Sequence, residues 1–172
     1  MEVMKTVAEL MALSAITAPK AKGQDYINVK VIIEPAVLTY LADEMSKCSE
    51  ENGKKFFNRD AANIRNSQAL VLLSLKDAKH AGLNCGACGR PSCAMLETVT
   101  QGPEFNGPLC PWRLIDLGIA LGSAVKTAGT LNADNRIMYS AGAVAKKIGL
   151  IEGDIAVAIP LNASSKNIYF DR

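Results

Sequence analysis

Ala69-Leu70-Val71-Leu72-Leu73-Ser74-Leu75 is a continuous apolar run near the middle of the 172-residue chain. Apolar residues that do not alternate with polar ones are typical of a strand covered on both faces. Helices are the usual elements that cover a sheet in this way. We therefore expect an α+β or three-layer α/β fold, with helices around a modest β-sheet, in a single domain spanning residues 1–172.

Hydrophobic periodicity and turn residues divide the rest of the chain into helices and further strands. Pro19 is expected to end the first helix, because the residue before a proline avoids helical backbone angles. Pro35 suits the first turn of a helix, and Gly53 suits a C-terminal cap. The expected helices are residues 3–18, 35–52, 56–65, 114–130 and 138–148, and the other expected strands are residues 26–33 and 154–161.

The segment 114–130 is almost wholly apolar, which predicts a helix that is buried all round. Small residues recur along it, including Gly118, Gly122 and Ala124. Small side chains allow another helix or a partner subunit to approach closely. The sequence therefore favours a homodimer.

Four of the five cysteines have the spacing C-x2-C-x4-C-x16-C, at Cys85, Cys88, Cys93 and Cys110. They lie in a Gly- and Pro-rich segment, residues 80–112, which we call the cysteine insert because it interrupts the core elements. Thiolates are the ligands that iron–sulfur clusters and zinc select. The two-residue gap after Cys85 lets one turn present two thiolates to a single centre. We expect a [4Fe–4S] cluster in this insert.

Two alternatives for the cysteines stay open. Structural zinc also takes thiolates, although four-cysteine zinc sites usually show two short C-x2-C pairs. Disulfides or uncoordinated thiols are the other alternative, although in a reducing compartment clustered cysteines are more often metal ligands than disulfides. Between Cys93 and Cys110 the length of chain predicts a helical segment, at about residues 94–101. Pro111 is expected to hold Cys110 outside the helix that follows.

Composition argues against nucleic acids and membranes as partners. The formal charge of +2 and an aromatic content of 5% give no support for nucleic-acid binding. The first residues lack a basic region followed by an apolar run, and no stretch approaches 18 apolar residues, so neither a signal peptide nor a membrane span is expected. These features favour a cytoplasmic protein that does not bind membranes. A redox partner protein is expected, but the sequence does not identify it.

The stretch Cys85-Gly86-Ala87-Cys88-Gly89-Arg90-Pro91-Ser92-Cys93, closed by Cys110-Pro111, resembles a known iron–sulfur domain. It is similar to the [4Fe–4S] domain of the B subunits of Rnf-type electron-transport complexes and of corrinoid iron–sulfur proteins. The resemblance implies that all four cysteines ligate one cluster and that the protein transfers electrons. Arg90 stands where those domains often have a bulky aromatic, a change that would alter solvent access or potential.

The whole chain also resembles an uncharacterised family of ferredoxin-domain proteins from anaerobic bacteria and archaea. That resemblance implies an anaerobic source and leaves the activity open. It rests on the cysteine insert and on residues 17–23, 116–120, 134–142 and 166–172.

Outside the insert, the order of elements weakly resembles the flavin-dependent nitroreductase fold. Ala18-Pro19-Lys20 followed by the strand 26–33 is similar to the loop near the flavin in that family. The resemblance implies FMN as a second cofactor and a flavin-dependent oxidoreductase as an alternative to a simple electron carrier. The family's Arg-Ser-x-Arg start is absent here. Candidate replacements for binding the flavin phosphate are Lys20, Lys22, Arg136, Lys166 and Arg172.

Several other residues have a functional and a structural interpretation. The single histidine, His80, would ligate or carry protons, but a loop position is the expectation. Cys48 is expected to be a small buried hydrophobe. Trp112 would either shield the cluster or be an ordinary core aromatic. The polar residues 134–136 are expected to cap the helix that follows them rather than to contact a ligand.

Overall fold

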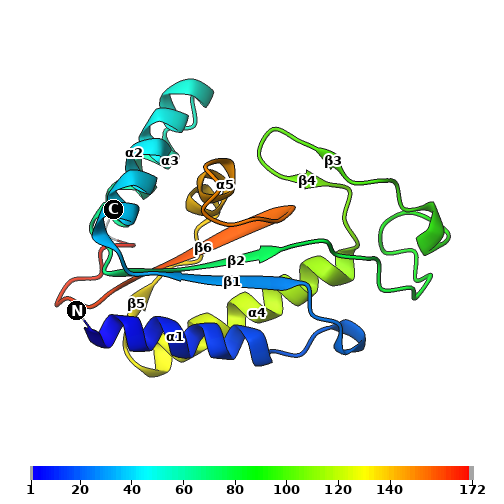
Figure 1. Cartoon of the computed structure of the whole chain (residues 1–172), viewed down its shortest axis with the longest axis horizontal. Helices are drawn as coiled ribbons and strands as arrows, with labels where there is room; N and C mark the ends of the chain where they lie inside the picture. Colours follow the sequence, from blue (N-terminus) through cyan, green and yellow to red (C-terminus); the bar gives the residue numbers. More distant parts are fainter. Residues whose placement is uncertain (1, 171–172) are drawn as a thin grey trace.

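The computed structural model describes residues 2–170, and its centre is a four-stranded antiparallel sheet (Figure 1). The strands are β1 (Ile27–Ile32), β2 (Ala69–Leu75), β5 (Asp134–Asn135) and β6 (Ile155–Asn162), in the spatial order β1-β2-β6-β5. β2 coincides with the apolar run, and all seven of its residues are buried. Its main chain pairs with β1 on one side and with β6 on the other.

Helices cover both faces of this sheet (Figure 1). On one face lie α1 (Glu2–Thr17) and α4 (Pro111–Thr130), and on the other lie α2 (Pro35–Asn52), α3 (Phe56–Arg65) and α5 (Tyr139–Lys147). Alternation along β2 explains why two cores form, since successive side chains of a strand point to opposite faces. Val71 and Leu73 pack in the core under α1 and α4, whereas Leu70 and Leu72 pack under the other three helices. The predicted α+β fold is confirmed.

Local signals explain where α2 begins and ends. Pro35 lies in its first turn, where the missing N–H has no helical partner to lose. Gly53 follows its last residue with φ of 70°, a left-handed conformation that glycine adopts without steric strain. The bounds of α2 and α3 agree with the ranges predicted from the sequence.

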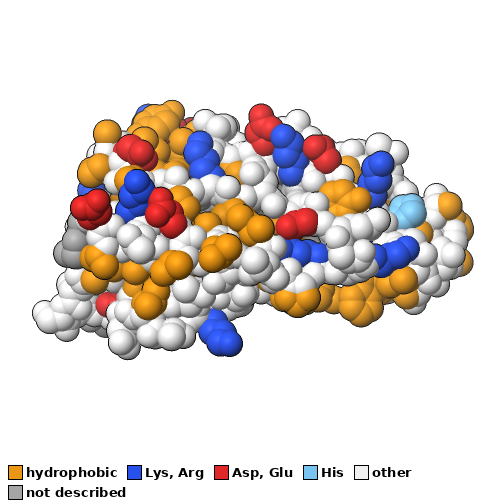
Figure 2. Space-filling view, turned by 60° about the horizontal axis from the view of Figure 1, so that its bottom comes forward, with side chains coloured by type: hydrophobic (Ala, Val, Ile, Leu, Met, Phe, Trp, Pro, Cys, Tyr) orange, Lys and Arg blue, Asp and Glu red, His pale blue; other side chains and the backbone are white. Residues whose placement is uncertain are grey.

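The prediction that α4 is buried all round is wrong. Ile115 and Ile119 are 45% and 40% exposed, because α1 and the sheet cover only one side of the helix. The same side of the molecule carries exposed Leu13 and Ile16 of α1. Figure 2 brings this side forward and shows hydrophobic side chains across its lower half. No helix within residues 2–170, the 20-residue α4 included, combines the length and apolar character that crossing a membrane requires.

The polar residues 134–136 do not cap α5, so that prediction is also wrong. Asp134 and Asn135 form β5, whose main chain pairs with Asn162 and Leu161 of β6. Met138 is the residue that precedes α5, and no side chain caps the helix there. A two-residue strand leaves no periodic signal in the sequence, so pairing with β6 could not be anticipated.

Candidate metal centre

The cysteine insert leaves the end of β2 and projects beyond the sheet before returning to α4 (Figure 1). It contains a short 3-10 turn, η2 (Cys93–Met95), and a hairpin of β3 (Thr100–Gln101) and β4 (Asn106–Gly107). The helix predicted over residues 94–101 is therefore wrong. Val99 and Thr100 are β-branched and favour extended backbone. Gly102 then closes the turn, with its N–H 3.0 Å from the Phe105 carbonyl oxygen.

The four cysteines of the insert differ in exposure. Cys85 is exposed, Cys88 and Cys93 are half-buried, and Cys110 is buried. The structure holds all of them as free thiols. Gly86 and Gly89, with φ of 72° and 78°, turn the backbone tightly on either side of Cys88.

Hydrogen bonds to sulfur connect separate parts of the insert. The Asn84 N–H donates to Sγ of Cys93 at 3.3 Å, and the Cys93 N–H donates to Oδ1 of Asn84 at 2.8 Å. The indole Nε1–H of Trp112 donates to Sγ of Cys85 at 3.2 Å. The first contacts tie the beginning of the motif to its third cysteine. The last ties its first cysteine to the start of α4, where Trp112 is 38% exposed and is therefore not a core aromatic.

Two features favour thiolate character at this site. The Ala87 backbone N–H, and secondly the Trp112 indole, hold the pKa of the Cys85 thiol below its ordinary value. Cys110 is the residue that immediately precedes α4, in extended conformation as Pro111 requires. The N-terminus of a long helix carries partial positive charge, which attracts a negatively charged centre held beside it.

The donor chemistry of the insert fits a soft metal or an iron–sulfur centre. It offers four free thiols, together with N–H donors directed at two of the sulfurs. Over residues 2–170, however, no three His, Cys, Asp or Glu side chains are gathered in an arrangement that would hold a metal ion. Convergence of the four sulfurs on one centre stays a prediction.

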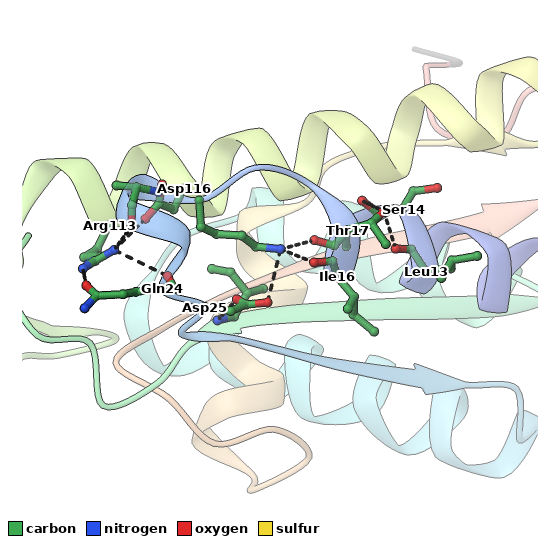
Figure 3. A network of polar contacts seen from close by, with 12 residues as sticks. Leu13, Ser14, Ile16, Thr17, Gln24, Asp25, Arg113 and Asp116 are labelled. Atoms are coloured by element: carbon green, nitrogen blue, oxygen red, sulfur yellow. Dashed lines mark hydrogen bonds and ion pairs between the residues drawn. The ribbon is translucent and has the colours of Figure 1, made fainter.

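A buried ionic network fixes the base of the insert (Figure 3). The Arg113 guanidinium, fully buried, donates to the carbonyl oxygen of Lys79 at 2.9 Å and to that of Ala21 at 3.0 Å. Its Nη1 lies 3.2 Å from Oδ2 of Asp116, which is also buried. The Tyr26 ring lies under the guanidinium, 4.8 Å from Cζ to the ring centroid. Sequence reasoning missed Arg113; the available signal was a cation at the start of an apolar helix.

The cations predicted to hold a flavin phosphate do not come together. The Lys20 ammonium is buried at the end of α1, where it donates to the Ala15 carbonyl oxygen at 2.7 Å and pairs with Asp25 at 3.2 Å. Lys22 is exposed in the following turn, η1 (Ala21–Gly23), and its ammonium lies near Gly82 of the insert. Both belong to the end of the molecule that carries the insert (Figure 1).

The remaining phosphate candidates lie toward the opposite end of the sheet. Arg136 directly follows β5 and pairs with the buried Asp60 of α3 at 3.4 Å. Lys166 belongs to the tail after β6, where its carbonyl oxygen accepts a hydrogen bond from Ser164. Arg172 is outside the described residues. A single phosphate therefore cannot be contacted by Lys20 and Arg136 of the same chain.

His80 occupies the exposed loop position expected for it, just before the cysteines. Cys48 is 6% exposed, in agreement with the prediction of a buried residue. Sequence reasoning did not anticipate its neighbour: Nζ of Lys147, from α5, lies 3.3 Å from Sγ of Cys48. Contacts between separate helices leave no signal in the spacing of a single sequence.

Comparison with known proteins identifies a related family. Residues 106–172 match the family described as "Uncharacterized protein containing a ferredoxin domain (DUF2148)". The matched residues include Cys110 and α4, and they begin after the other three cysteines of the insert. An uncharacterized protein of Archaeoglobus fulgidus is 45% identical over 172 residues, which cover 99% of this chain and 92% of that protein.

Solved nitroreductases share the fold. The FMN-dependent nitroreductase from Clostridium difficile is 13% identical with a TM-score of 0.59, covering 94% of this chain and 77% of that chain. Nitroreductase A from Vibrio parahaemolyticus is 12% identical with a TM-score of 0.59, covering 95% of this chain and 60% of that chain. At these identities the likeness concerns the fold alone. The predicted nitroreductase-like architecture is confirmed.

Proposed function

We propose a function from the following premise: the chain belongs to the family of uncharacterized proteins that contain a ferredoxin domain. The proposed function is electron transfer through one [4Fe–4S] cluster, ligated by the thiolates of Cys85, Cys88, Cys93 and Cys110. The proposed setting is the reducing cytoplasm of an anaerobe, where thiolates persist and clusters survive. The physiological partner would be another redox protein.

The observation that carries this proposal is the pair of N–H donors directed at sulfur. Trp112 donates to Cys85 and the Asn84 backbone donates to Cys93. Hydrogen bonds of this kind stabilise negative charge on cluster thiolates and set the reduction potential. A structural zinc site would need the thiolates equally, but it has no potential to tune.

Different residues of the insert would anchor the centre to the core and leave one side of it accessible. Cys110, buried at the N-terminus of α4, would supply the ligand anchored to the rigid core. Cys85 is exposed, so the opposite side would remain open to a partner. A bound cluster supplies one-electron chemistry, and Trp112 and the backbone N–H groups adjust its potential. Arg113 fixes the carbonyl of Lys79 and so holds the entry to the insert.

Metal and sulfide analysis of anaerobically purified protein tests the proposal. We expect about four iron and four acid-labile sulfide per chain. Cys88→Ser should lose most of the iron while the far-UV circular dichroism is kept, because the two hydrophobic cores lie outside the insert. Cys48→Ser is the matched control, since it removes a thiol on α2 and should retain iron. Colourless protein with one zinc per chain, or full iron in Cys88→Ser, would refute the proposal.

A second candidate is a flavin-dependent oxidoreductase that carries its own cluster. The fold supports it, because the C. difficile protein of the same architecture is described as FMN-dependent. Lys20 and Lys22 lie at one end of the sheet and Arg136 at the other, so within one chain only one of these groups would contact the flavin phosphate. Flavin fluorescence after heat denaturation measures the amount of bound FMN directly. FMN at about one per chain supports the enzyme, and its absence after purification with added FMN excludes it.

We also propose that the protein is a homodimer. Exposed apolar residues follow both helices of one face, with Leu13 and Ile16 on α1 and Ile115 and Ile119 on α4. Gly118, between the latter two, has no atom within 4 Å of the position a Cβ would occupy, so another surface can approach closely. A second copy with the same apolar face would remove these side chains from water.

A further inference from the structure

A cavity of about 510 Å³ lies where the cysteine insert meets the core, and none of the four cysteines of the insert lines it. Its walls come from the second half of α2, the start of α3, the last turns of α5 and the turn between β3 and β4. Figure 1 shows these elements on the same side of the sheet. Cavities of roughly 300–1,000 Å³ are the size that small ligands occupy.

The β3–β4 turn, which forms one wall of the cavity, is fixed to the core by side-chain contacts. Glu104, in the β3–β4 turn, accepts a hydrogen bond from Lys54 with 2.7 Å between Nζ and Oε1. Its other carboxylate oxygen accepts a hydrogen bond from the Tyr139 hydroxyl. The Phe105 ring packs edge-on against Tyr139, with 5.5 Å between centroids. These contacts hold the β3–β4 turn against the core, so the walls of the cavity are fixed in place by the fold.

The cavity contains a thiol next to an ammonium group. Cys48 lines it, and its Sγ lies 3.3 Å from Nζ of Lys147. The Glu51 carboxylate, and secondly Cys48, raise the pKa of Lys147, so this side chain keeps its charge. Because Cys48 is 6% exposed, a reagent can reach its sulfur only by entering the cavity.

The charge around the cavity favours an anion. Three lysines and two glutamates are among its described lining residues: Lys54, Lys146, Lys147, Glu51 and Glu104. The Lys147–Glu51 pair is 2.9 Å long, but its side chains are 58% and 64% exposed. Exposed pairs contribute little, so a carboxylate entering the cavity can replace Glu51. Lys146 contacts a neutral partner, with Nζ 3.3 Å from Oδ1 of Asn106.

Apolar groups complete the lining. The Phe57 ring and the side chains of Ala143 and Val144 form part of the wall. A ligand with one carboxylate and a short carbon body would match this combination of ammonium groups and apolar surface. Inorganic phosphate, with more charge and no apolar part, would match it less well.

We propose that this cavity binds a small organic carboxylate, held by the ammonium groups of Lys147 and Lys146 beside the thiol of Cys48. This site is independent of the cluster, and no residue of the four-cysteine set belongs to it. The Cys48 thiol reports on it, because it can be alkylated by reagents of the same size that differ in charge.

The test compares alkylation of Cys48 by iodoacetate and by iodoacetamide in full-length, anaerobically purified protein. In both reactions the thiolate attacks the methylene carbon, a C–S bond forms and iodide leaves, so only the charge of the reagent differs. Peptide mass spectrometry separates Cys48 from the other cysteines. We expect the rate ratio of iodoacetate to iodoacetamide to exceed that of the unfolded protein by at least about threefold. Millimolar butyrate, which has one carboxylate and a short carbon body, should slow the reaction with iodoacetamide.

Variants distinguish attraction of the anionic reagent by the cavity lysines from a general effect of surface charge. Lys147→Gln should return the ratio to the unfolded value, and Lys147→Arg should preserve it. Any change in the pKa of Cys48 affects both reagents equally and cancels in the ratio. Lys76→Gln is the matched control, because Lys76 forms a similar exposed pair with Glu152 at the end of β2 and should leave the ratio unchanged. Circular dichroism checks that each variant folds.

Three results would overturn the proposal. The first is a native ratio equal to that of the unfolded protein. The second is Cys48 that resists both reagents until the protein is denatured, because the cavity then admits no ligand. The third is a rate of reaction with iodoacetamide that butyrate does not change. Loss of iron in Cys88→Ser would not affect any of them, so failure here and failure of the electron-transfer proposal are distinguishable.

Discussion

Arg113 and Asp116 form a buried ion pair one helical turn apart at the start of α4, with 3.2 Å between Nη1 and Oδ2. Their side chains are 0% and 4% exposed. Asp116 also accepts the Ala21 N–H at 2.8 Å, and Arg113 donates to the Lys79 carbonyl oxygen. One ion pair thus joins α4 to the turn after α1 (Figure 3), and Arg113 also joins it to the entry of the cysteine insert.

Removing one partner of this pair should destabilise the protein strongly. Arg113→Met leaves Asp116 buried and unpaired, which typically costs about 3–5 kcal/mol. The free energy of unfolding, from urea titration under anaerobic conditions, measures the loss. Arg65→Ala is the matched control, since its pair with Asp43 is 43% and 53% exposed and should contribute less than about 1 kcal/mol. Equal losses in the two variants would contradict the structural role.

The elements that sequence predicted well are those with a strong local signal. β2 is a continuous apolar run, and α2 begins with Pro35 and ends before Gly53, so its limits follow from local backbone preferences. The β3–β4 hairpin and β5 have two-residue strands, in which no period can be detected. Their existence depends on tertiary pairing, which a single sequence does not record.

The residues of the candidate site also fall into two groups, those that the sequence predicted and those that it did not. Spacing alone singled out the four cysteines as candidate ligands, because a shared metal centre requires such ligands at short, defined intervals; their ligation stays a prediction. The side chains that support them were not predictable. Trp112 reaches Cys85 across 27 residues, and Arg113 reaches Gln24 across 89. Such contacts are created by the fold, as is the approach of Lys147 to Cys48.

Trp112→Phe should lower the reduction potential of the proposed cluster without removing it. The indole N–H donates to the Cys85 sulfur, and this bond favours the more negatively charged reduced state. Phenylalanine keeps an aromatic ring and removes the donor, so we expect a negative shift on the order of tens of millivolts. Anaerobic redox titration followed by electron paramagnetic resonance measures it.

Tyr139→Phe is the control for Trp112→Phe. It removes a hydroxyl that donates to Glu104 beside the insert, but this hydroxyl does not contact sulfur. The potential should then remain within error of the wild type. Iron content must be full in both variants for the comparison to hold. An unchanged potential in Trp112→Phe would show that the indole does not tune the centre.

Charge placed on the apolar face of α1 and α4 should dissociate the proposed homodimer. Ile119 is 40% exposed on α4, and a lysine there would have to be desolvated in the interface. We expect Ile119→Lys to weaken self-association at least about tenfold, which corresponds to ~1.4 kcal/mol. Sedimentation velocity should give a mass of two 18.3 kDa chains for the wild type. Tyr40→Lys, at a 50% exposed site on α2, should remain dimeric. A monomeric wild type would reject the dimer.

Tyr169 should make the protein less stable at alkaline pH. Its side chain is buried, and its hydroxyl lies 2.9 Å from Oγ of Ser67. Burial raises the pKa of Tyr169 well above its ordinary value of 10.0, with a smaller contribution in the same direction from Asp134. The folded state therefore retains a proton that the unfolded state releases. The contribution of Tyr169 to stability is fully present below the unfolded pKa and is lost as the pH rises toward the folded pKa.

Urea unfolding at pH values on both sides of about 10 measures this contribution. Above that pH, the free energy of unfolding should fall by up to ~1.4 kcal/mol per pH unit through this single group. Tyr169→Phe cannot ionise, so its stability should decline less steeply, although it loses the bond to Ser67 and starts lower. Tyr40→Phe, at an exposed position, should follow the wild-type profile. Parallel profiles for the wild type and Tyr169→Phe would show that the Tyr169 hydroxyl reaches water and ionises in the folded protein.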